Sequence, residues 1–560
     1  MSKIKFLGLG GLGEKGKNMF VLEVDDRIFI LDAGLKYPSV ELYGIDNVIP
    51  DITYLIENKD HVQGIFLSHC HEEHIGAIPE LLKNLDVGVF GTHFTISLVE
   101  EVLNEAGMNI SNHRLYRINQ DKVLKFGHIT VEFFNISHSV PECVGIAIKT
   151  EDGTIVYAPD FTFTTNIDKR YSTNFVKIAN IAQNGVLALL TESLGTTNLD
   201  RVSNDYLMNH KVNEVLQKKG RVIISMFSSD LDRVQKVVNL CVSQNRKVAI
   251  IGRKVQKIIN VAMNSDYLKV PQENLVNLRY IDDVNTNDDD NLAVIVTGLR
   301  HEPYFMLQRM SRGQDRLIQI TENDHVVIIA PPVIGTERME ARTMDVLYKQ
   351  GAKVYMLKKG ILRSYHADSE DLKMLYDILS PKYIIPIIGE YRHQFKQKEV
   401  AVEAGFDEKN VIILDNGQIA SFENGELVST EAKVQVGDVL VDGSIIGDIN
   451  EVVLKDREML SGDGVLIAAI HVDARTREIL TEPKFVCKGF VSKAPFEEIS
   501  KELEEDTYYV INNYFRKRYI DWNELKSDLR DVYNKTIYSL TKKNPIIIPN
   551  VIDVDAQSQL

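Results

Sequence analysis

The sequence is poor in the cysteines that cross-link small secreted proteins and in the long apolar runs that anchor membrane proteins. Only four cysteines occur among the 560 residues, and none belongs to a CxxC pair. This scarcity disfavours a disulfide framework and a thiolate zinc site, and it fits a reducing cytoplasm. No run of about 18 apolar residues is present, so we expect no membrane-spanning helix. The first residues enter a glycine-rich strand pattern without the apolar region of a signal peptide, which also favours a cytoplasmic protein.

Acidic residues outnumber basic ones, with 79 Asp and Glu against 64 Lys and Arg and a net charge of -15. At long range such a molecule repels polyanions, so a nucleic acid would have to bind in a local basic channel. A chain of 560 residues exceeds the size of one hydrophobic core and indicates roughly two to four domains.

The order of strand-like and helix-like segments divides the chain into regions. Up to about residue 200, short β-rich runs with turns indicate a hairpin-rich sheet with added helices. Residues 203–345 alternate apolar strands with helices, which is typical of a doubly wound parallel sheet. Residues 346–430 are compatible with a return to the first domain, and a small α+β domain follows. Helices are expected over residues 94–108, 231–242, 496–515 and 522–540.

The densest group of metal-ligand residues is the run HCHEEH at residues 69–74, directly after an apolar strand. With 14 histidines in the chain, the spacing H-x-H-x-x-H would arise by chance in roughly one of a hundred such chains. Imidazole binds first-row metals, and a neighbouring carboxylate suits a second, harder cation. His69 and His71 can hold one ion, while Glu73 and His74 face another, which is the form of a dinuclear site.

Two residues from later strand ends can complete this ligand set. His138 follows the strand-like run 129–134, and Asp160 ends the next hairpin. Alone, each would most often be structural, as a buried hydrogen-bonded histidine or a carboxylate that caps a turn. Beside the histidine run we favour a ligand role for both, with Asp160 bridging the two ions.

Motifs along nearly the whole chain resemble those of the ribonuclease J family. They are LGGLGEKGKN at 9–18, DAG at 32–34, GID at 44–46, IPD at 49–51, the histidine run at 69–74, SHS at 137–139, PDF at 159–161 and GEYR at 389–392. Within this family the chain looks most similar to the second, less active paralogue of Gram-positive bacteria, which works largely as a partner of the fuller enzyme.

The resemblance implies an α/β fold: a metallo-β-lactamase αββα sandwich with an inserted doubly wound β-CASP domain and a small C-terminal α+β domain. The expected domains are the sandwich over 1–202 and 346–430, the β-CASP domain over 203–345, a linker over 431–455 and a C-terminal dimerisation domain over 456–560.

The resemblance also implies a cytoplasmic hydrolase that cuts RNA phosphodiesters with two zinc or manganese ions. It would act 5′→3′ from an end and also internally, in ribosomal RNA maturation and mRNA decay. The implied partners are RNA, a second copy of the chain and a paralogous ribonuclease J subunit, with no membrane.

The same resemblance assigns roles to individual residues. The implied metal ligands are His69, His71, Glu73, His74, His138 and Asp160. The implied catalytic residues are Asp160, Glu192 and His366, of which His366 contacts the scissile phosphate and is the general-acid candidate. The implied RNA contacts are Ser364, His366, Ser228, Ser229 and Arg300. For Asp32 and Glu192, which match supporting acids of the family, a structural role is equally open.

Two departures from the family pattern affect the second ion. Glu73 stands where the family has Asp, and its carboxylate reaches one methylene further. Ile388 stands where the family has a late metal-binding histidine, and isoleucine has no ligand atom. We therefore expect a second metal site that is weak or empty, and reduced activity.

Other departures concern substrate contacts. Leu362 and Tyr365 replace the first His and the Gly of an H-x-S-G-H stretch, and Leu299 and Arg300 replace Ser-Gln in a loop for the 5′-phosphate. Arg300 either holds a phosphate or blocks its pocket. Further cations of the insert are candidates for an RNA groove: Arg253, Lys254, Lys257, Arg309, Arg312 and Arg316.

Three functions stay open on the sequence. The first is a weakly active ribonuclease, and the second is a largely inactive RNA-binding subunit that stabilises an active paralogue, with Ile388 as its main support. A small-molecule hydrolase on the same scaffold is weaker, because such an enzyme needs no β-CASP-like insert.

Overall fold

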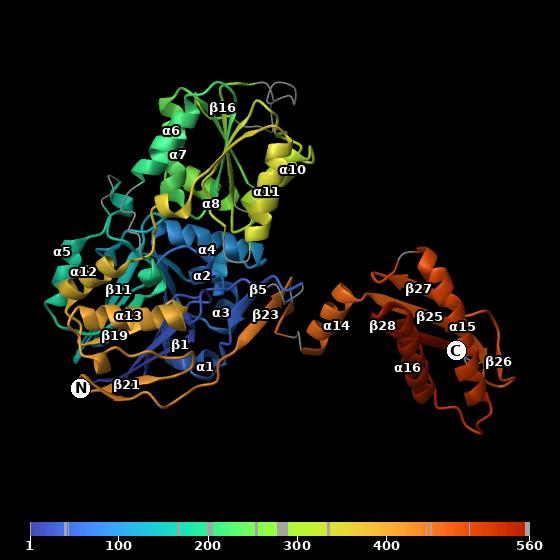
Figure 1. Cartoon of the computed structure of the whole chain (residues 1–560). Helices are drawn as coiled ribbons and strands as arrows, with labels where there is room; N and C mark the ends of the chain where they lie inside the picture. Colours follow the sequence, from blue (N-terminus) through green and yellow to red (C-terminus); the bar gives the residue numbers. More distant parts are fainter. Residues whose placement is uncertain are drawn as a thin grey trace. The chain divides into compact units, whose positions relative to one another are not determined.

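The computed structural model divides the chain into two compact units. One comprises Met1–Lys36 and Ile49–Asp438, and the other comprises Tyr37–Val48 and Val439–Leu560 (Figure 1). The residues described are 2–38, 42, 44–164, 168–198, 205–252, 256–276, 289–332, 336–443, 445–447, 451–491 and 493–554.

The larger unit is built on two facing sheets. The first has the strand order β22-β21-β1-β3-β4-β6-β7-β8 and the second has the order β19-β13-β12-β11-β10-β9. The strands of the first sheet are β1 (Lys3–Gly10), β3 (Met19–Val24), β4 (Arg27–Leu31), β6 (Val62–Phe66), β7 (Val89–Gly91), β8 (Leu115–Arg117), β21 (Ala420–Glu423) and β22 (Glu426–Ser429). Those of the second are β9 (Val123–Phe126), β10 (Ile129–Asn135), β11 (Val144–Thr150), β12 (Gly153–Ala158), β13 (Val186–Glu192) and β19 (Tyr383–Ile387).

The core of this unit lies between the two sheets. One cluster of buried side chains draws on both of them, and the rings of Phe20 and Tyr157 lie 5.8 Å apart across the gap. β13 is buried at every position, as expected for a strand with neighbours on both sides and a second sheet over one face.

Helices cover the outer faces of the two sheets. α3 (Ile78–Asn84) and α4 (His93–Glu105) pack together beside β7 and β8 of the first sheet. α5 (Phe175–Ala182), α12 (Ser369–Leu379) and α13 (Tyr391–Glu403) form a layer on the second sheet. The expected αββα sandwich is therefore confirmed.

The inserted region forms a separate parallel sheet with the order β15-β16-β14-β17-β18. Its strands are β14 (Val222–Phe227), β15 (Lys247–Ile251), β16 (Leu292–Gly298), β17 (His325–Ile328) and β18 (Lys353–Met356). Its helices are α6 (Tyr206–Leu216), α7 (Leu231–Ser243), α8 (Gln256–Asn264), α10 (Glu302–Ser311) and α11 (Glu337–Lys349). In Figure 1, α6 and α7 lie on one side of the sheet and α10 and α11 on the other, which confirms the doubly wound arrangement. β18 extends this sheet beyond residue 345, and the exact domain boundaries stay a prediction.

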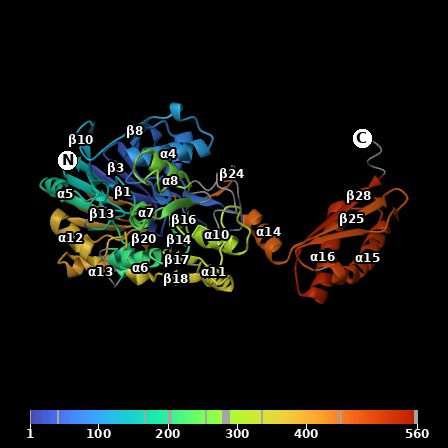
Figure 2. The same cartoon turned by 90° about the horizontal axis from the view of Figure 1, so that it is seen from above.

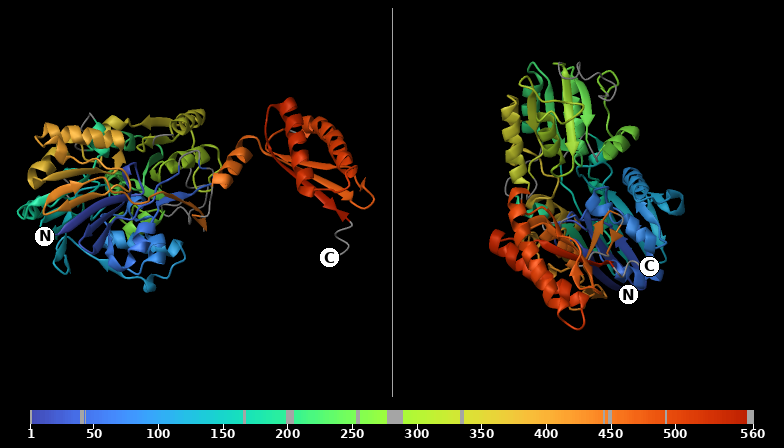
Figure 3. Two further views of the ribbon diagram at one scale, coloured as in Figure 1. Left: turned by 90° about the horizontal axis from the view of Figure 1, so that it is seen from below. Right: turned by 90° about the vertical axis from the view of Figure 1, so that its right-hand side faces the viewer.

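The smaller unit has a core of its own. β25 (Val465–Asp473) pairs with β26 (Glu478–Ile479), β27 (Lys484–Lys488) and β28 (Ile546–Asp553). The helices α15 (Lys493–Phe515) and α16 (Trp522–Thr541) pack on one face of this sheet (Figure 2 and Figure 3), and α14 (Glu451–Gly462) precedes it. Alternate residues of β25, from Leu466 to Val472, are buried against the helices. The small α+β domain is confirmed.

No helix in the described part of the chain combines the length and the apolar character that a bilayer crossing needs.

Candidate metal centre

The predicted ligand residues converge at the ends of several strands of the sandwich. The histidine run follows β6, His138 follows β10 and Asp160 follows β12. Glu192 is the last residue of β13, and His366 lies on the segment that returns from the inserted sheet. Turns and loops after rigid strands place side chains well for binding, because the scaffold holds them in position.

Three imidazoles direct one nitrogen each toward a common point. His71 Nδ1 lies 3.1 Å from His69 Nε2 and 3.4 Å from His138 Nε2. Zinc–nitrogen bonds of 2.0–2.1 Å at tetrahedral angles separate two ligand nitrogens by about 3.3 Å. The spacing of the three nitrogens therefore fits a first-row metal ion, and these three histidines form one group of potential ligands.

His69 has a polar partner on the side away from this point. Its Nδ1 donates to the hydroxyl of Ser68 at 3.0 Å, and that hydroxyl donates to Asp32 Oδ2 at 2.7 Å. Metal-binding histidines generally donate their second N–H in this way, which fixes the tautomer and the ring orientation. Asp32 thus helps to orient the His69 ring through Ser68, and it is itself completely buried.

His74 and Asp160 form a second group beside the first. His74 Nε2 lies 2.7 Å from Asp160 Oδ2, and His69 Nε2 lies 3.7 Å from the same oxygen. The other nitrogen of His74, Nδ1, contacts Asp32 Oδ2 at 2.7 Å. Asp160 therefore lies between the three-histidine group and His74, where a bridging carboxylate was expected.

Glu73 stands apart from these groups. It belongs to α2 (Glu72–Ile75), and its backbone carbonyl accepts a hydrogen bond from the N–H of Asn18. Among the described residues, its carboxylate is in none of the three sets of ligand atoms that lie within 4.8 Å of one another. The geometry thus brings together five of the six predicted ligands.

Ile388 occupies a strained and enclosed position in the sandwich. It follows β19, is 1% exposed and belongs to the core cluster between the sheets. Its φ of 49° is unfavourable for a β-branched residue, and its N–H donates to the Gly11 carbonyl at 2.8 Å. The side chain at this position is therefore aliphatic and enclosed, and it offers no ligand atom.

His366 lies against two buried carboxylates. Its Nδ1 is 2.8 Å from Glu192 Oε2 and 3.1 Å from Asp160 Oδ1. The other oxygen of Glu192 accepts the backbone N–H groups of Phe161 and Ala367 at 2.7 and 3.0 Å. These two hydrogen bonds hold the Glu192 carboxylate in place, and the carboxylate in turn orients the His366 imidazole.

Burial and neighbouring charges shift the pKa values of these groups in opposite directions. Burial and the adjacent imidazoles hold the pKa of His69 and of His138 well below the usual value. Burial also lowers the pKa of His366, but the nearby carboxylates outweigh it and raise the value to about 10. Burial raises the pKa of Glu192 to about 7, against the effect of His366. His69 and His138 are therefore neutral and offer lone pairs to a cation.

The residues predicted to contact RNA differ in their exposure. Ser228 is completely buried, whereas Ser229, Ser364 and Arg300 are partly exposed. The carbonyl of Ser229 faces His71, with 3.3 Å between it and Nε2. Of the predicted basic groove residues, Arg309, Arg312 and Arg316 are described, whereas Arg253, Lys254 and the side chain of Lys257 lie outside the described residues.

Sequence reasoning missed several polar groups of the centre. Asn18 Nδ2 lies 3.0 Å from His74 Nε2, and the Tyr157 hydroxyl donates to Asp32 Oδ2. Asn18 is the last residue of the glycine-rich motif at 9–18, so this motif could have indicated that Asn18 belongs to the centre. Tyr157 lies in an apolar strand and gave none.

The sandwich, the doubly wound insert and the histidine-rich centre define a class, the metal-dependent hydrolases of the β-lactamase superfamily with a β-CASP insert. Four family models match the chain in line with this class. They are the β-lactamase superfamily domain at residues 31–182, the ribonuclease J β-CASP domain at 219–347, the Zn-dependent metallo-hydrolase RNA specificity domain at 353–414 and the ribonuclease J C-terminal domain at 452–554.

Similarity to curated proteins extends over nearly the whole chain. Ribonuclease J 2 of Staphylococcus epidermidis is 34% identical over 552 residues, with 98% of each chain covered. Ribonuclease J 2 of Staphylococcus aureus is 34% identical over 553 residues with the same coverage. The chain belongs to the ribonuclease J family and is similar to its second paralogue.

A solved structure supports the fold alone. A protein of unknown function from Enterococcus faecalis V583 is 15% identical and superposes with a TM-score of 0.52. The match covers 75% of this chain and all of the other.

Proposed function

We propose that the protein is a weakly active, metal-dependent ribonuclease of the ribonuclease J type. It acts 5′→3′ from an end and also internally, in ribosomal RNA maturation and mRNA decay in the cytoplasm. The observation that carries the proposal is the convergence of three imidazoles, with His71 Nδ1 3.1 Å from His69 Nε2 and 3.4 Å from His138 Nε2, beside Asp160. Membership of the family supports RNA as the substrate.

The donor set suits zinc or manganese at one strong site. His69, His71 and His138 would hold one ion, while His74 and Asp160 would contribute to a second, with Glu73 further away. A bound divalent cation supplies positive charge that stabilises a phosphodiester transition state and makes water more acidic. The second site lacks a ligand at Ile388, so we expect it to be weak or empty.

His366 is placed to donate a proton to the leaving oxygen. Its Nδ1 is held by Glu192, so the second ring nitrogen, Nε2, is the one that can face substrate. Its side chain is 34% exposed, whereas Glu192 is completely buried. Glu192 therefore positions the imidazole and stabilises its charged form, and His366 exchanges the proton.

The partly exposed residues Ser229, Ser364 and Arg300 line our proposed path for the RNA backbone. Arg300 follows β16 at a φ of 49°. Strand ends of an open parallel sheet commonly bind phosphates, which supports a 5′-phosphate pocket here. The proposed β-CASP domain covers residues 203–345 with β18 added, and the C-terminal unit is our proposed site of dimerisation with a second copy or a paralogous ribonuclease J subunit.

A second candidate function is favoured by one specific observation. Ile388 is buried in the core, and the resemblance to the family puts a metal ligand at this position, so the second ion would lose one ligand. A chain with this defect can still bind RNA and stabilise an active paralogue.

A turnover assay on 5′-monophosphorylated RNA separates the two candidates. Purified protein is assayed with Mn²⁺ or Zn²⁺, beside His71→Ala. Turnover by the native chain that disappears in His71→Ala supports the ribonuclease. Turnover that is absent, or that is equal in both proteins, leaves only the role of an RNA-binding subunit.

A further inference from the structure

The inserted domain supplies part of the outer shell of the three-histidine group. His71 belongs to the sandwich, yet its Nε2 donates toward the carbonyl of Ser229, the second residue after β14, at 3.3 Å. The Ser139 hydroxyl donates to the same carbonyl at 3.2 Å and lies 3.3 Å from His71 Nε2. The orientation of this imidazole therefore depends on a backbone oxygen of the inserted domain.

His138 depends on the segment that returns from the inserted sheet. Its Nδ1 donates to the carbonyl of Tyr365 at 3.0 Å. The Tyr365 side chain is buried, with the guanidinium of Arg363 4.5 Å from the ring centroid and that of Arg233 5.0 Å from it. Two cations against one ring leave Tyr365 little freedom, so its carbonyl stays aimed at His138.

One carboxylate joins these two outer-shell segments. Asp232 Oδ2 accepts from the Tyr365 hydroxyl at 3.1 Å and from Arg363 at 3.0 Å. The residue lies in the first turn of α7, three positions after Ser229, and its backbone N–H donates to the Ser139 carbonyl at 3.0 Å. Asp232 is 4% exposed, so these contacts are shielded from water.

We propose that Asp232 is a positioning residue for the metal centre. Its carboxylate orients His138 through Tyr365, and its backbone N–H ties the start of α7 to Ser139, whose hydroxyl contacts the Ser229 carbonyl. The affinity of the three-histidine group for a divalent ion then depends on the seating of the inserted domain on the sandwich. This inference rests on the proposed function, because it takes those three histidines as metal ligands.

Titration of the full chain with Co²⁺ tests the proposal. Cobalt bound by three imidazoles absorbs visible light, and the band reports both affinity and ligand geometry. In Asp232→Asn we expect roughly a tenfold or greater rise in the Co²⁺ dissociation constant and an altered band, as is typical when an outer-shell partner is lost. Tyr365→Phe, which removes only the hydroxyl, should shift both in the same direction by less.

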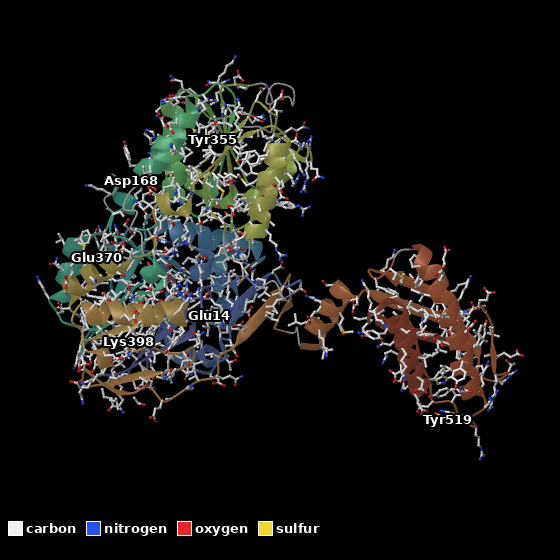
Figure 4. The ribbon with its side chains drawn as sticks, viewed as in Figure 1. Glu14, Asp168, Tyr355, Glu370, Lys398 and Tyr519 are labelled. Atoms are coloured by element: carbon white, nitrogen blue, oxygen red, sulfur yellow. The ribbon has the colours of Figure 1, made fainter. Side chains whose placement is uncertain are left out.

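A matched control comes from the same domain. Tyr355 lies on β18 (Figure 4), and its hydroxyl contacts His325 Nδ1 at 3.2 Å. Tyr355→Phe removes one comparable polar contact away from the centre and should leave the Co²⁺ titration unchanged.

The outcomes are distinct. If Asp232→Asn does not fold, Tyr365→Phe and its control decide the question. Co²⁺ affinities and bands of the folded variants that equal those of the native chain overturn the positioning role and leave the proposed metal site intact. If the native chain itself binds no Co²⁺, the proposed metal site and this inference fall together.

Discussion

The Nδ1 atom of His366 lies 2.8 Å from Oε2 of Glu192, although the two residues are separated by the whole inserted domain. The contact joins the end of β13 to the segment that returns to the sandwich. It gives a partly exposed imidazole one fixed orientation beside Asp160.

His366→Asn should remove most of the turnover and leave metal binding in place. General-acid residues contribute about 10²- to 10⁴-fold to rate, and the three-histidine group does not include His366. Single-turnover cleavage of RNA and metal content per chain measure the two effects. His210→Asn, on an exposed part of α6, is the control. A variant that cleaves at the native rate would remove His366 from the mechanism.

His71→Ala should lower metal affinity and turnover together. The substitution removes a central nitrogen, since Nδ1 of His71 is within 3.4 Å of both other imidazoles. Calorimetry with Zn²⁺ gives the affinity. Removing the metal with a chelator and then adding Zn²⁺ back shows whether turnover depends on the bound metal. His61→Ala, at the end of an exposed 3-10 helix, should behave as the native chain. Unchanged stoichiometry in His71→Ala contradicts the assignment of this ligand.

Ile388→His should raise the occupancy of the second site and increase the rate of RNA cleavage. It restores a ligand atom, and histidine tolerates a φ of 49° better than a β-branched side chain. We therefore expect no loss of thermal stability. Metal content and cleavage rate are compared with those of Ile388→Leu. If both values are unchanged, the alignment of the β19 segment with the family is wrong.

Leu529→Ala should destabilise the smaller unit alone. Leu529 is 0% exposed in a core that draws only on that unit. Loss of a buried leucine costs about 2–5 kcal/mol, so a denaturant midpoint for this unit should fall. Hydrogen exchange that shows equal loosening of both units would contradict their independence.

Local patterns in the sequence predicted much of the fold. The helix expected over 94–108 is present as α4, and it ends at Glu105 because Gly107 adopts a φ of 68°. The helix expected over 522–540 is α16. The three histidines of the run at 69–74 lie close together, because a short turn after a buried strand leaves them few other positions.

Other features of the centre could not be predicted from residue types. The carbonyl groups of Ser229 and Tyr365 act through the backbone, which carries no side-chain signature. Glu73 matched the expected spacing, yet its carboxylate, on the helical turn α2, is in none of the three ligand sets found among the described residues. Such outcomes depend on backbone direction after a turn, which periodicity does not determine.

The parallel pairing of β13 with β19 has a consequence for the growing polypeptide. Thr191 and Glu192 pair with Pro386 and Ile387, so the two strands meet only after the inserted domain has been translated between them. Until then β13, which carries Glu192, is an unfinished edge of the second sheet. We expect a nascent chain that ends before residue 383 to leave RNA uncut, even while it remains beside the messenger on the ribosome.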